Sequence, residues 1–349
     1  MSLTPKEIPT GAVRYNTDSN KMEVYISDTW MEVSVSTPNL GGGAGSNTGT
    51  GTRGFAAGGS DPGYTATIDF YTIPTQGNSS DFGDLTLARG NGMAGFSSRT
   101  RGVSAGGFDP TANYKRIDFV TMSSGGDATN FGSLTSNREG PMGLSNETRG
   151  IAAAGWSRPN SNNIQEIDFV TIATAADSLD FGDLITPTNY GAGAASPTRG
   201  LLIAGNIPAP GDMYNRIEFI TIATTGNAQE FGELKQAHQY TLSGASNSTR
   251  ALAWGGSTIP STDTPTNIIE FITIATKGNG TNFGDMTRAV KSAAGATASS
   301  TRSVCLGGNS ENIIEYVEIS TQGNAVDFGD ATSGRNNAAC FSNGHGGLG

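Results

Sequence analysis

The chain has 349 residues, a formal net charge of −10 at pH 7 and two cysteines. An acidic chain is a poor partner for nucleic acid or an anionic membrane surface, and two cysteines give no disulfide framework. The first residues lack the charged-then-apolar pattern of a signal peptide, and no apolar run approaches the roughly 20 residues of a membrane-spanning helix. We therefore expect a soluble protein that is made in the cytosol and is not exported by the usual route.

Residues 1–36 are predicted to form a small β module. Within them, alternating apolar residues predict three short strands, separated by polar turns at residues 16–20 and 27–29. Three short strands are too few to be stable alone, so we expect a partner chain or an assembly to cover their apolar side chains. These side chains are Val13, Tyr15, Met22, Val24, Tyr25 and Trp30.

This module resembles a segment that is common in bacteriophage tail-fibre and other virion appendage proteins. The matching parts are residues 11–16, residues 21–25 and Trp30. The resemblance implies attachment to other virion proteins or formation of a homo-oligomer, with a trimer favoured. Residues 37–51 have the composition of a flexible Gly/Ser/Thr-rich linker. An anchor, a tether and a globular head together form the layout of an adhesive appendage.

Residues 52–349 contain three patterns that each occur six times, with a period of about 50 residues. Each repeat contains four strand-like pieces. The first two are small and apolar, the third is β-branched and alternating, and the fourth is expected at an outer edge. The I-[DE]-[FY] copies begin at Ile68, Ile117, Ile167, Ile217, Ile269 and Ile314, the F-G copies at Phe82, Phe131, Phe181, Phe231, Phe283 and Phe328, and the T-R copies at Thr52, Thr100, Thr148, Thr198, Thr249 and Thr301.

The repeat resembles that of the kelch and galactose-oxidase-like propeller family. It shares a Gly-Gly pair after the second strand, as in Gly58-Gly59, and an aromatic residue in the third strand, as in Phe70. It differs by carrying Phe where the family usually has Trp, and by having the single glycines Gly155 and Gly205 in two repeats. The resemblance implies an all-β fold, a six-bladed kelch-like β-propeller with four-stranded blades over residues 52–349, and no particular function.

The end of the chain is predicted to complete the first blade. The first repeat begins at its second strand, and residues 335–343 align with the first-strand segment of the next repeat, residues 88–98. A C-terminal strand that pairs with the first repeat would remove the open edges of a linear array. We therefore expect the propeller to be closed by its last strand.

Each repeat also carries an arginine at the start of the second strand and an acidic residue in the third. One interpretation is a ring of charge that binds a ligand. We favour a cross-strand Arg–carboxylate pair within each repeat, because sixfold recurrence suits a scaffold better than a site. The arginines are Arg53, Arg101, Arg149, Arg199, Arg250 and Arg302, and the acids are Asp69, Asp118, Asp168, Glu218, Glu270 and Glu315.

Signals for catalysis are weak. The two histidines, His238 and His345, have no Cys or His neighbour at metal-ligand spacing, so we expect no zinc or copper site and no cofactor. The terminal G-x-G-x-x-G at residues 344–349 is followed by no helix, and the Asp-Phe-Gly triplets lack the other kinase motifs. A pair of carboxylates for glycoside hydrolysis stays open, since acids are plentiful. We predict that the protein is not an enzyme.

The segments that vary most between repeats are expected to share one face, formed by the loops between strands two and three and by the connections between blades. They combine aromatic side chains with Asp, Asn and Ser, which suits sugar recognition by stacking and hydrogen bonding. For any single residue, the alternative of an ordinary solvated loop stays open. For the face as a whole we favour binding, because loops on a rigid scaffold commonly carry function. The candidate ligand-binding residues are Tyr64, Tyr114, Trp156, Tyr214, Arg89, Arg138, Tyr190, His238 and Tyr240.

These patterns together favour a structural appendage, or fibre, protein of a phage virion whose propeller head binds a host-surface glycan. We expect the protein to be made in the host cytoplasm, to reside in the virion and to contact other virion proteins through residues 1–36. One alternative is a propeller enzyme that depolymerises surface polysaccharide, which would release reducing ends. Another is a non-viral kelch-type interaction protein, which would bind a soluble partner and no particle.

Overall fold

The computed structural model describes residues 9–16, 21–26, 29–32, 52–60, 63–109, 115–157, 160–207, 213–238, 243–257, 264–292 and 295–349. The chain divides into two compact units, Met1–Gly42 and Gly43–Gly349, which we call unit 1 and unit 2. The division falls within the predicted linker, whose own residues lie outside the described ranges. Over the described residues, we find no helix with the length and apolar character needed to cross a membrane.

Unit 1 contains the three predicted strands. They are β1 (Val13–Asn16), β2 (Lys21–Ile26) and β3 (Thr29–Glu32), paired antiparallel in the order β1-β2-β3. Val13 pairs with Val24, and Val24 pairs with Met31, so these residues lie on one face of the sheet. The predicted turns fall largely on residues 17–20 and 27–28, outside the described residues.

The apolar residues of unit 1 divide between the two faces of its sheet. On one face, Tyr25 is buried and its ring lies 5.2 Å from that of Trp30, while the Arg14 guanidinium stacks 4.2 Å from the Trp30 ring centre. The other face leaves Val13 and Tyr15 exposed by 59% and 53%. The prediction that all the apolar side chains need an outside cover is therefore wrong for Tyr25, which the unit buries itself. The side chain of Met22 lies outside the described residues.

Unit 2 is all-β, as predicted, and its described residues form six four-stranded antiparallel sheets and one two-stranded hairpin. We number the four-stranded sheets 1–6 and give their strands in hydrogen-bonding order. Sheet 1 contains β29 (Ala339–Ser342), β4 (Arg53–Ala57), β5 (Thr67–Thr72) and β6 (Ser80–Asp84); sheet 2 contains β7 (Ala94–Ser97), β8 (Arg101–Ala105), β9 (Arg116–Thr121) and β10 (Thr129–Ser133); sheet 3 contains β11 (Met142–Ser145), β12 (Arg149–Ala153), β15 (Glu166–Thr171) and β16 (Leu179–Asp183).

Sheets 4 and 5 have longer outer strands than the first three. Two short 3-10 helices, η2 (Ile73–Thr75) and η3 (Gly346–Leu348), and the hairpin of β13 (Trp156–Ser157) and β14 (Asn162–Asn163) complete the elements. Sheet 4 contains β17 (Ala192–Ala195), β18 (Arg199–Asn206), β19 (Met213–Thr221) and β20 (Gln229–His238); sheet 5 contains β21 (Ser243–Ser246), β22 (Arg250–Trp254), β23 (Thr266–Thr273) and β24 (Thr281–Val290); sheet 6 contains β25 (Gly295–Ala298), β26 (Arg302–Leu306), β27 (Ile313–Glu318) and β28 (Val326–Asp330).

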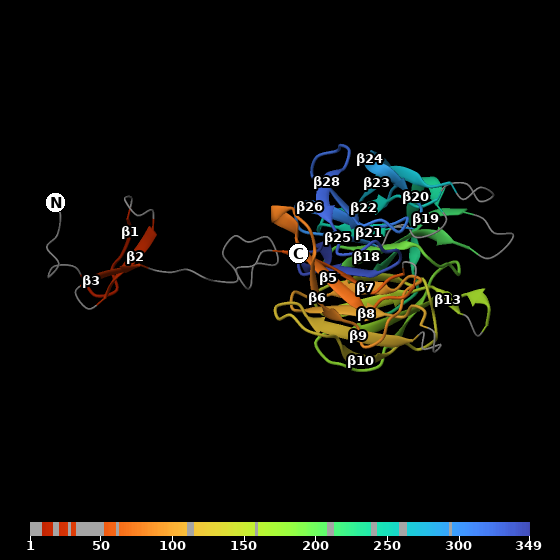
Figure 1. The fold of residues 1–349 in the computed structure, drawn as a ribbon, viewed down its shortest axis with the longest axis horizontal. Coiled ribbons are helices and arrows are strands. Elements are labelled where there is room, and N and C mark those ends of the chain that lie inside the picture. The colour runs from red at the N-terminus through yellow and green to blue at the C-terminus, as the bar shows by residue number, and fades with distance from the viewer. Residues whose placement is uncertain are drawn as a thin grey trace. The chain divides into compact units, whose positions relative to one another are not determined.

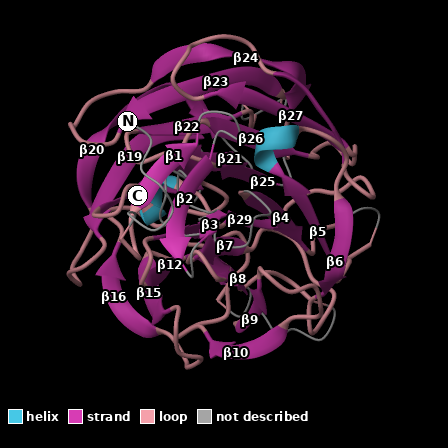
Figure 2. Cartoon of the chain, turned by 90° about the vertical axis from the view of Figure 1, so that its left-hand side faces the viewer, coloured by secondary structure: helices cyan, strands magenta, loops and turns pink. Residues whose placement is uncertain are grey.

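The first strands of the six sheets contact one another in a cycle. The contacts run β29–β7–β11–β17–β21–β25 and return to β29. Figure 2 shows these strands near the centre of unit 2 and the fourth strands, such as β10 and β24, at its periphery. The last strand, β29, pairs antiparallel with β4, with Phe341 opposite Phe55, which confirms the predicted pairing of the C-terminal segment with the first repeat. This arrangement is compatible with the predicted propeller.

The hydrophobic core consists of clusters between neighbouring sheets. One cluster joins Ile167 and Phe181 of sheet 3 to Leu202 and Ile220 of sheet 4. The glycine of each F-G pattern makes this close packing possible, because a Cβ added there would lie 2.2–2.6 Å from backbone atoms of the next sheet's turn. These glycines are Gly83, Gly132, Gly182, Gly232, Gly284 and Gly329.

A polar contact between sheets also recurs six times. In each sheet, an Asn or Asp side chain in the turn between strands three and four accepts a hydrogen bond from a backbone N–H of the preceding sheet's fourth strand, at 2.9–3.1 Å. The copy between Asn78 and Asp330 joins sheet 1 to sheet 6. The turn residues are Asn78, Asp127, Asp177, Asn227, Asn279 and Asn324.

The arginines of the T-R pattern make a different contact from the predicted one. Arg149 donates to the carbonyl oxygen of Ile222 in the next sheet, at 3.1 Å, and its guanidinium lies 4.7 Å from the Phe169 ring centre. The other five arginines make equivalent bonds to the next sheet, including Arg302 to Ile73. The predicted cross-strand pairing with the acid of the same repeat is wrong, because Arg149 lies opposite Thr171 in the register and Asp168 lies opposite Ala152.

Candidate functional site

The two kinds of segment that were predicted to share one face meet in one region of unit 2. Isolated backbone bridges join a connection between sheets to a loop between strands two and three: Gly90 to Phe108, Glu139 to Trp156, Asn189 to Asn206, and Asn336 to Ser60. We call this region the loop face. In Figure 1 the β13 hairpin of the loop face and the C-terminus lie toward opposite sides of unit 2. Tyr114 and Tyr240, and the side chain of Tyr214, lie outside the described residues.

Arg89 and Arg138, two of the predicted site residues, belong to the interior. Both side chains are fully buried, and they form ion pairs with Asp118 at 3.2 Å and Asp168 at 3.1 Å. Arg138 also donates to the carbonyl oxygen of Glu166 at 3.0 Å. Because their guanidinium groups are enclosed and paired, these arginines stabilise the connection between sheets and are not available to a surface ligand.

His238 is also buried, at the position that corresponds to Arg138 in the repeat. Its Nε2 lies 3.7 Å from Glu270 Oε1, beyond hydrogen-bond distance, and neither ring nitrogen has a hydrogen-bond partner among the described residues. His238, the last residue of β20 in sheet 4, is thus a core residue that faces Glu270 of sheet 5 and does not line the loop face.

Tyr64 does lie on the loop face, in an aromatic pair that sequence reasoning described only in part. Its ring lies 5.2 Å from that of Phe108, and its hydroxyl accepts a hydrogen bond from Asn91 Nδ2 at 3.3 Å. Both rings are partly exposed. Phe108 and Asn91 were missed as site residues, although each stands next to a glycine in a segment that varies between repeats.

Trp156 lies on the loop face at the junction of sheets 3 and 4. It is partly exposed, and its backbone exchanges hydrogen bonds with Glu139 at 2.7 and 3.0 Å. Nearby, Asn163 donates through Nδ2 to the carbonyl oxygen of Asn206 at 2.9 Å. The Oδ1 atoms of Asn163 and Asn189 are buried and have no partner among the described residues. An aromatic ring beside amide groups is the combination expected for sugar contacts.

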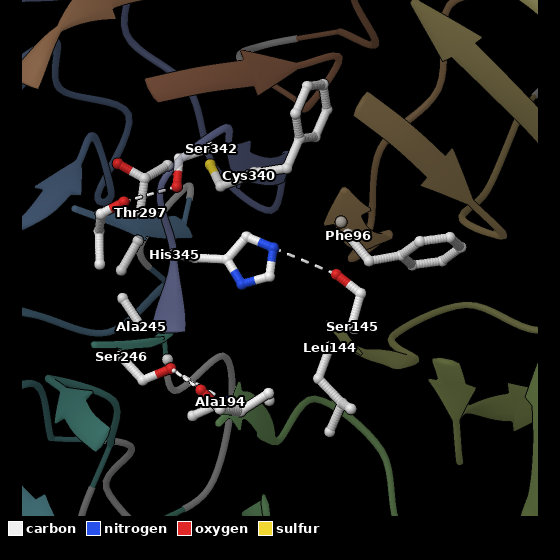
Figure 3. A pocket seen from close by; sticks show the side chains of 18 of the residues that line it. Phe96, Leu144, Ser145, Ala194, Ala245, Ser246, Thr297, Cys340, Ser342 and His345 are labelled. Atoms are coloured by element: carbon white, nitrogen blue, oxygen red, sulfur yellow. Dashed lines mark hydrogen bonds between the residues drawn. The ribbon is translucent and has the colours of Figure 1, made fainter. Parts of the chain in front are cut away.

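A narrow channel runs along the centre of unit 2, between the first strands of the sheets. Glycines from four of these strands line it, together with Ala296 and Cys340. At the end away from the loop face, the imidazole of His345 projects into it (Figure 3), leaving a cavity of about 50 Å³. The last residues of the chain therefore close this end of the channel.

His345 is held as a neutral ring. Its Nδ1 accepts a hydrogen bond from Gly347 N–H at 3.1 Å, so Nε2 carries the proton and donates to the Ser97 carbonyl oxygen at 3.1 Å. Burial lowers the pKa of His345 to about 4. Ser145, 3.2 Å from Nε2, already donates to the Ser97 carbonyl oxygen and accepts from Ser97 N–H. The contact is thus structural and does not provide an activated nucleophile.

At the loop face the channel ends in an open mouth with a cavity of about 70 Å³. Gly140, Tyr190 and Asn337 occupy equivalent positions at its rim, because each directly follows a bridge residue on a different connection. All three have a left-handed backbone, with φ of 67°, 53° and 56°. The Tyr190 ring lies close against Gly140, where an added Cβ would be 2.9 Å from it. Of the predicted residues, the structure brings Tyr190 to this mouth.

Possible metal ligands and the thiol in the channel wall bear on the chemistry of these sites. Within the part of the chain that the structure describes, no three His, Cys, Asp or Glu side chains cluster in a way that could hold a metal ion. Cys340 in the channel wall has its pKa raised to about 12 by burial, so it is a poor thiolate nucleophile. In comparisons with known proteins, no family model and no curated protein matched the chain.

Proposed function

We propose that unit 2 is a six-bladed, kelch-like β-propeller and that the chain is a structural fibre protein of a phage virion, which binds a host-surface glycan through the loop face. The cycle of first-strand contacts and the pairing of β29 with β4 support the propeller. The resemblance of residues 11–30 to virion appendage modules supports the location. The loop face supports the ligand class, and it carries the proposal.

The decisive observation is a contrast between repeated and unrepeated polar residues. The repeated arginines and carboxylates form hydrogen bonds and ion pairs within unit 2, as in the pairs of Arg335 with Asp69 and Arg138 with Asp168. The unrepeated aromatics Tyr64, Trp156 and Tyr190 stay partly exposed beside amide groups on one face. A scaffold that satisfies its own charges and presents rings and amides suits a neutral, hydroxyl-rich ligand.

The proposal includes no chemical step. Each third-strand carboxylate accepts hydrogen bonds inside unit 2; for example, Glu218 accepts from Ile185 N–H at 2.9 Å and Glu315 accepts from Thr287 N–H at 2.7 Å. These groups are therefore committed and are not poised as an acid–base pair. Release of reducing ends from a bound polysaccharide would favour the depolymerase alternative instead.

Unit 1 is proposed to hold the fibre together or to attach it to other virion proteins. Its exposed face carries Val13, Tyr15, Ile26 and Met31, and the opposite face is closed by Arg14 stacked on Trp30. An apolar face on a three-stranded sheet is unfavourable in water, so a second copy or another virion protein would stabilise it. A homo-oligomer, with a trimer favoured, is the arrangement that we propose.

The test of the proposed function is binding of the labelled full-length chain to a panel of bacterial surface polysaccharides and intact host cells. We expect saturable binding that Trp156→Ala weakens at least tenfold, without release of reducing ends. Leu179→Ala is a matched control, because Leu179 is an exposed apolar side chain on β16, away from the loop face. Absence of binding to every polysaccharide and cell would overturn the proposal.

A further inference from the structure

At the mouth of the channel, the residue type at one repeated backbone position differs between the sheets. The equivalent position is glycine in sheet 3, where Gly140 has φ of 67°, yet sheets 4 and 1 carry Tyr190 and Asn337 there with φ of 53° and 56°. A left-handed backbone is unusual and costly for a bulky residue such as tyrosine, whereas asparagine adopts it more readily. The Tyr190 side chain is thus placed at this rim at the expense of backbone strain, and Asn337 adds an amide beside it.

The Asn337 amide has unused hydrogen-bonding capacity. Its Oδ1 is withdrawn from solvent and has no partner among the described residues, and the side chain forms part of the wall of the mouth. A buried acceptor without a partner is unfavourable. A ligand that donates a hydrogen bond to it therefore gains more binding free energy than the same bond on an open surface would give. The Asn337 Oδ1 is an acceptor, so it is complemented by a ligand group that brings an N–H donor.

The remaining wall of the mouth is uncharged and contains apolar side chains. It includes Met93, Met142, Ala296 and Ala338, and no described residue that lines it carries a charge. The cavity of about 70 Å³ is far below the roughly 300 Å³ of a pocket that encloses a whole small ligand. A short substituent therefore fits, and a sugar ring does not. A carboxylate substituent would find no cation there.

The channel behind the mouth is a dead end. His345 fills its far end and is fixed by the hydrogen bonds to Gly347 and Ser97. A polymer therefore cannot thread through unit 2, and only a chain end or a side substituent can enter. The Tyr190 ring at the rim offers a platform on which the sugar that carries this substituent can stack.

We propose that the mouth is a subsite for an N-acetylated sugar, in which the acetamido group enters the channel, donates its N–H to Asn337 Oδ1 and places its methyl group against the methionine and alanine side chains. This inference rests on the proposed glycan-binding function and names the sugar class that the loop face selects. The stacking ring is Tyr190, and the residue that determines specificity is Asn337.

The test uses the full-length chain and immobilised sugars in matched pairs that differ only in the acetamido group: N-acetylglucosamine and glucose, N-acetylgalactosamine and galactose, and N-acetylmannosamine and mannose. We expect at least one N-acetylated member to bind about tenfold more tightly than its partner, as one hydrogen bond to a buried acceptor without a partner would give. Asn337→Gly should abolish this preference, and Tyr190→Gly should weaken both members of the pair.

Both glycine variants keep the backbone that Gly140 already adopts at the equivalent position, so we expect them to fold. Asn337→Asp, which keeps the shape and an acceptor oxygen for the acetamido N–H, should retain the preference. Asn130→Ala, on the exposed edge strand β10, is the control that should retain it. Equal binding of all pairs, or a preference that survives Asn337→Gly, would overturn the subsite while leaving glycan binding intact; absence of binding to any polysaccharide overturns both.

Discussion

The connections that enter sheets 1, 2 and 3 are each anchored by a fully buried Arg–Asp ion pair, whereas the described residues before sheets 4, 5 and 6 hold no equivalent close pair; before sheet 6, Arg288 Nε lies 4.0 Å from Glu315 Oε1. Arg335, Arg89 and Arg138 each contact the third-strand aspartate of the sheet that they precede, at 3.0–3.2 Å. We call sheets 1–3 and sheets 4–6 the two halves of unit 2. In sheets 4–6 the positions that correspond to these arginines hold Thr188, His238 and Val290, and the third-strand acid is glutamate. The change from Asp to Glu accompanies the loss of arginine, and each glutamate accepts a backbone N–H from the connection, as Asp168 does from Thr135.

The first strands divide the molecule in the same way. Ser342, Ser97 and Ser145 of sheets 1–3 each donate from Oγ to a backbone carbonyl oxygen of the preceding sheet, at 2.6–2.8 Å. In sheets 4–6 the equivalent residues are Ala195, Ser246 and Ala298, so only one hydroxyl remains, and it donates to Ala195 at 2.8 Å. Two independent sets of polar contacts are therefore complete in one half and reduced in the other.

The two halves nevertheless fold into equivalent sheets, which indicates which contacts the architecture needs. The glycine of the F-G pattern, the turn Asn or Asp and the T-R arginine occur in all six sheets and link each sheet to the next. The ion pairs and the hydroxyl bonds add stability locally. A buried ion pair is weak support for a fold as a whole but expensive to break.

Removing one partner of an ion pair should have the largest effect. Arg138→Ala leaves Asp168 buried without its cation, and we expect it to lower the free energy of unfolding by about 3–5 kcal/mol. His238→Ala, at the corresponding position of the other half, should cost roughly 1–2 kcal/mol, because the imidazole is packed but not hydrogen-bonded to Glu270. Urea unfolding of the full-length variants measures both.

A double-variant cycle isolates the pair itself. Arg138→Ala combined with Asp168→Ala should be clearly less damaging than the sum of the single changes, whereas His238→Ala with Glu270→Ala should be close to additive. Equal losses for Arg138→Ala and His238→Ala would mean that the two halves are anchored equally well, and the comparison would fail.

The sequence predicts the sheets well because their signals are local and repeated. The periodic I-[DE]-[FY], F-G and T-R patterns locate the strands, and the incomplete first repeat correctly predicts the pairing of β29 with β4. The partner of Asp168 could not be predicted in the same way. The periodicity shows that arginines and acids recur, but only the strand register shows that Arg149 faces the next sheet and that Arg138 reaches Asp168.

The candidate site is less accessible from the sequence. Arg89 and Arg138 were placed on the surface because they lie in connections, and connections are usually exposed. The mouth of the channel joins residues as distant as Gly92, Tyr190 and Asn337, which only the folded chain brings together. A signal did exist, since aligning the connections places Tyr190 and Asn337 opposite Gly140. His345, dismissed as part of a terminal glycine motif, proves to close the channel.

Acid should weaken the contact that links the two halves at this closed end. His345 bonds to Ser97 of sheet 2, while η3 directly after it contacts β17 and β21 of sheets 4 and 5. The folded pKa of about 4 lies below the ordinary value of 6.5, so the unfolded chain binds more protons between these pH values. Stability should therefore fall as pH drops from about 6.5 to 4, by up to roughly 3 kcal/mol.

His345→Gln tests this pH dependence. Glutamine keeps a donor for the Ser97 carbonyl oxygen but does not titrate, so the variant should lose part of the slope of unfolding free energy between pH 4 and 6.5 and should match the native slope above pH 7. Melting temperatures measured across this range give both slopes. Superimposable acid profiles for the two proteins would show that His345 does not titrate as its burial implies.

The T-R arginine provides a change that should affect both halves alike. Arg149→Ala removes one hydrogen bond to a carbonyl oxygen of the next sheet and Arg250→Ala removes two from the same nitrogen, and each variant loses a stacking contact, on Phe169 or Phe271. We expect each to lower the free energy of unfolding by about 1–2 kcal/mol without changing glycan binding. A much larger loss for Arg149→Ala would mean that sheets 1–3 differ in more than their ion pairs and hydroxyl groups.

The smallest expected effect comes from adding a hydroxyl where sheets 4–6 lack one. Ala298 is buried at the position that serine occupies in β7, β11, β21 and β29, so Ala298→Ser should donate to the Ser246 carbonyl oxygen and raise the free energy of unfolding by about 0.5–1 kcal/mol. Ser97→Ala, which removes the bond to Ser342, should lower it by a similar amount. If Ala298→Ser destabilises the chain while Ser97→Ala behaves as expected, the first strand of sheet 6 is packed too tightly for a hydroxyl, and the alanine there reflects space instead of a missing hydrogen bond.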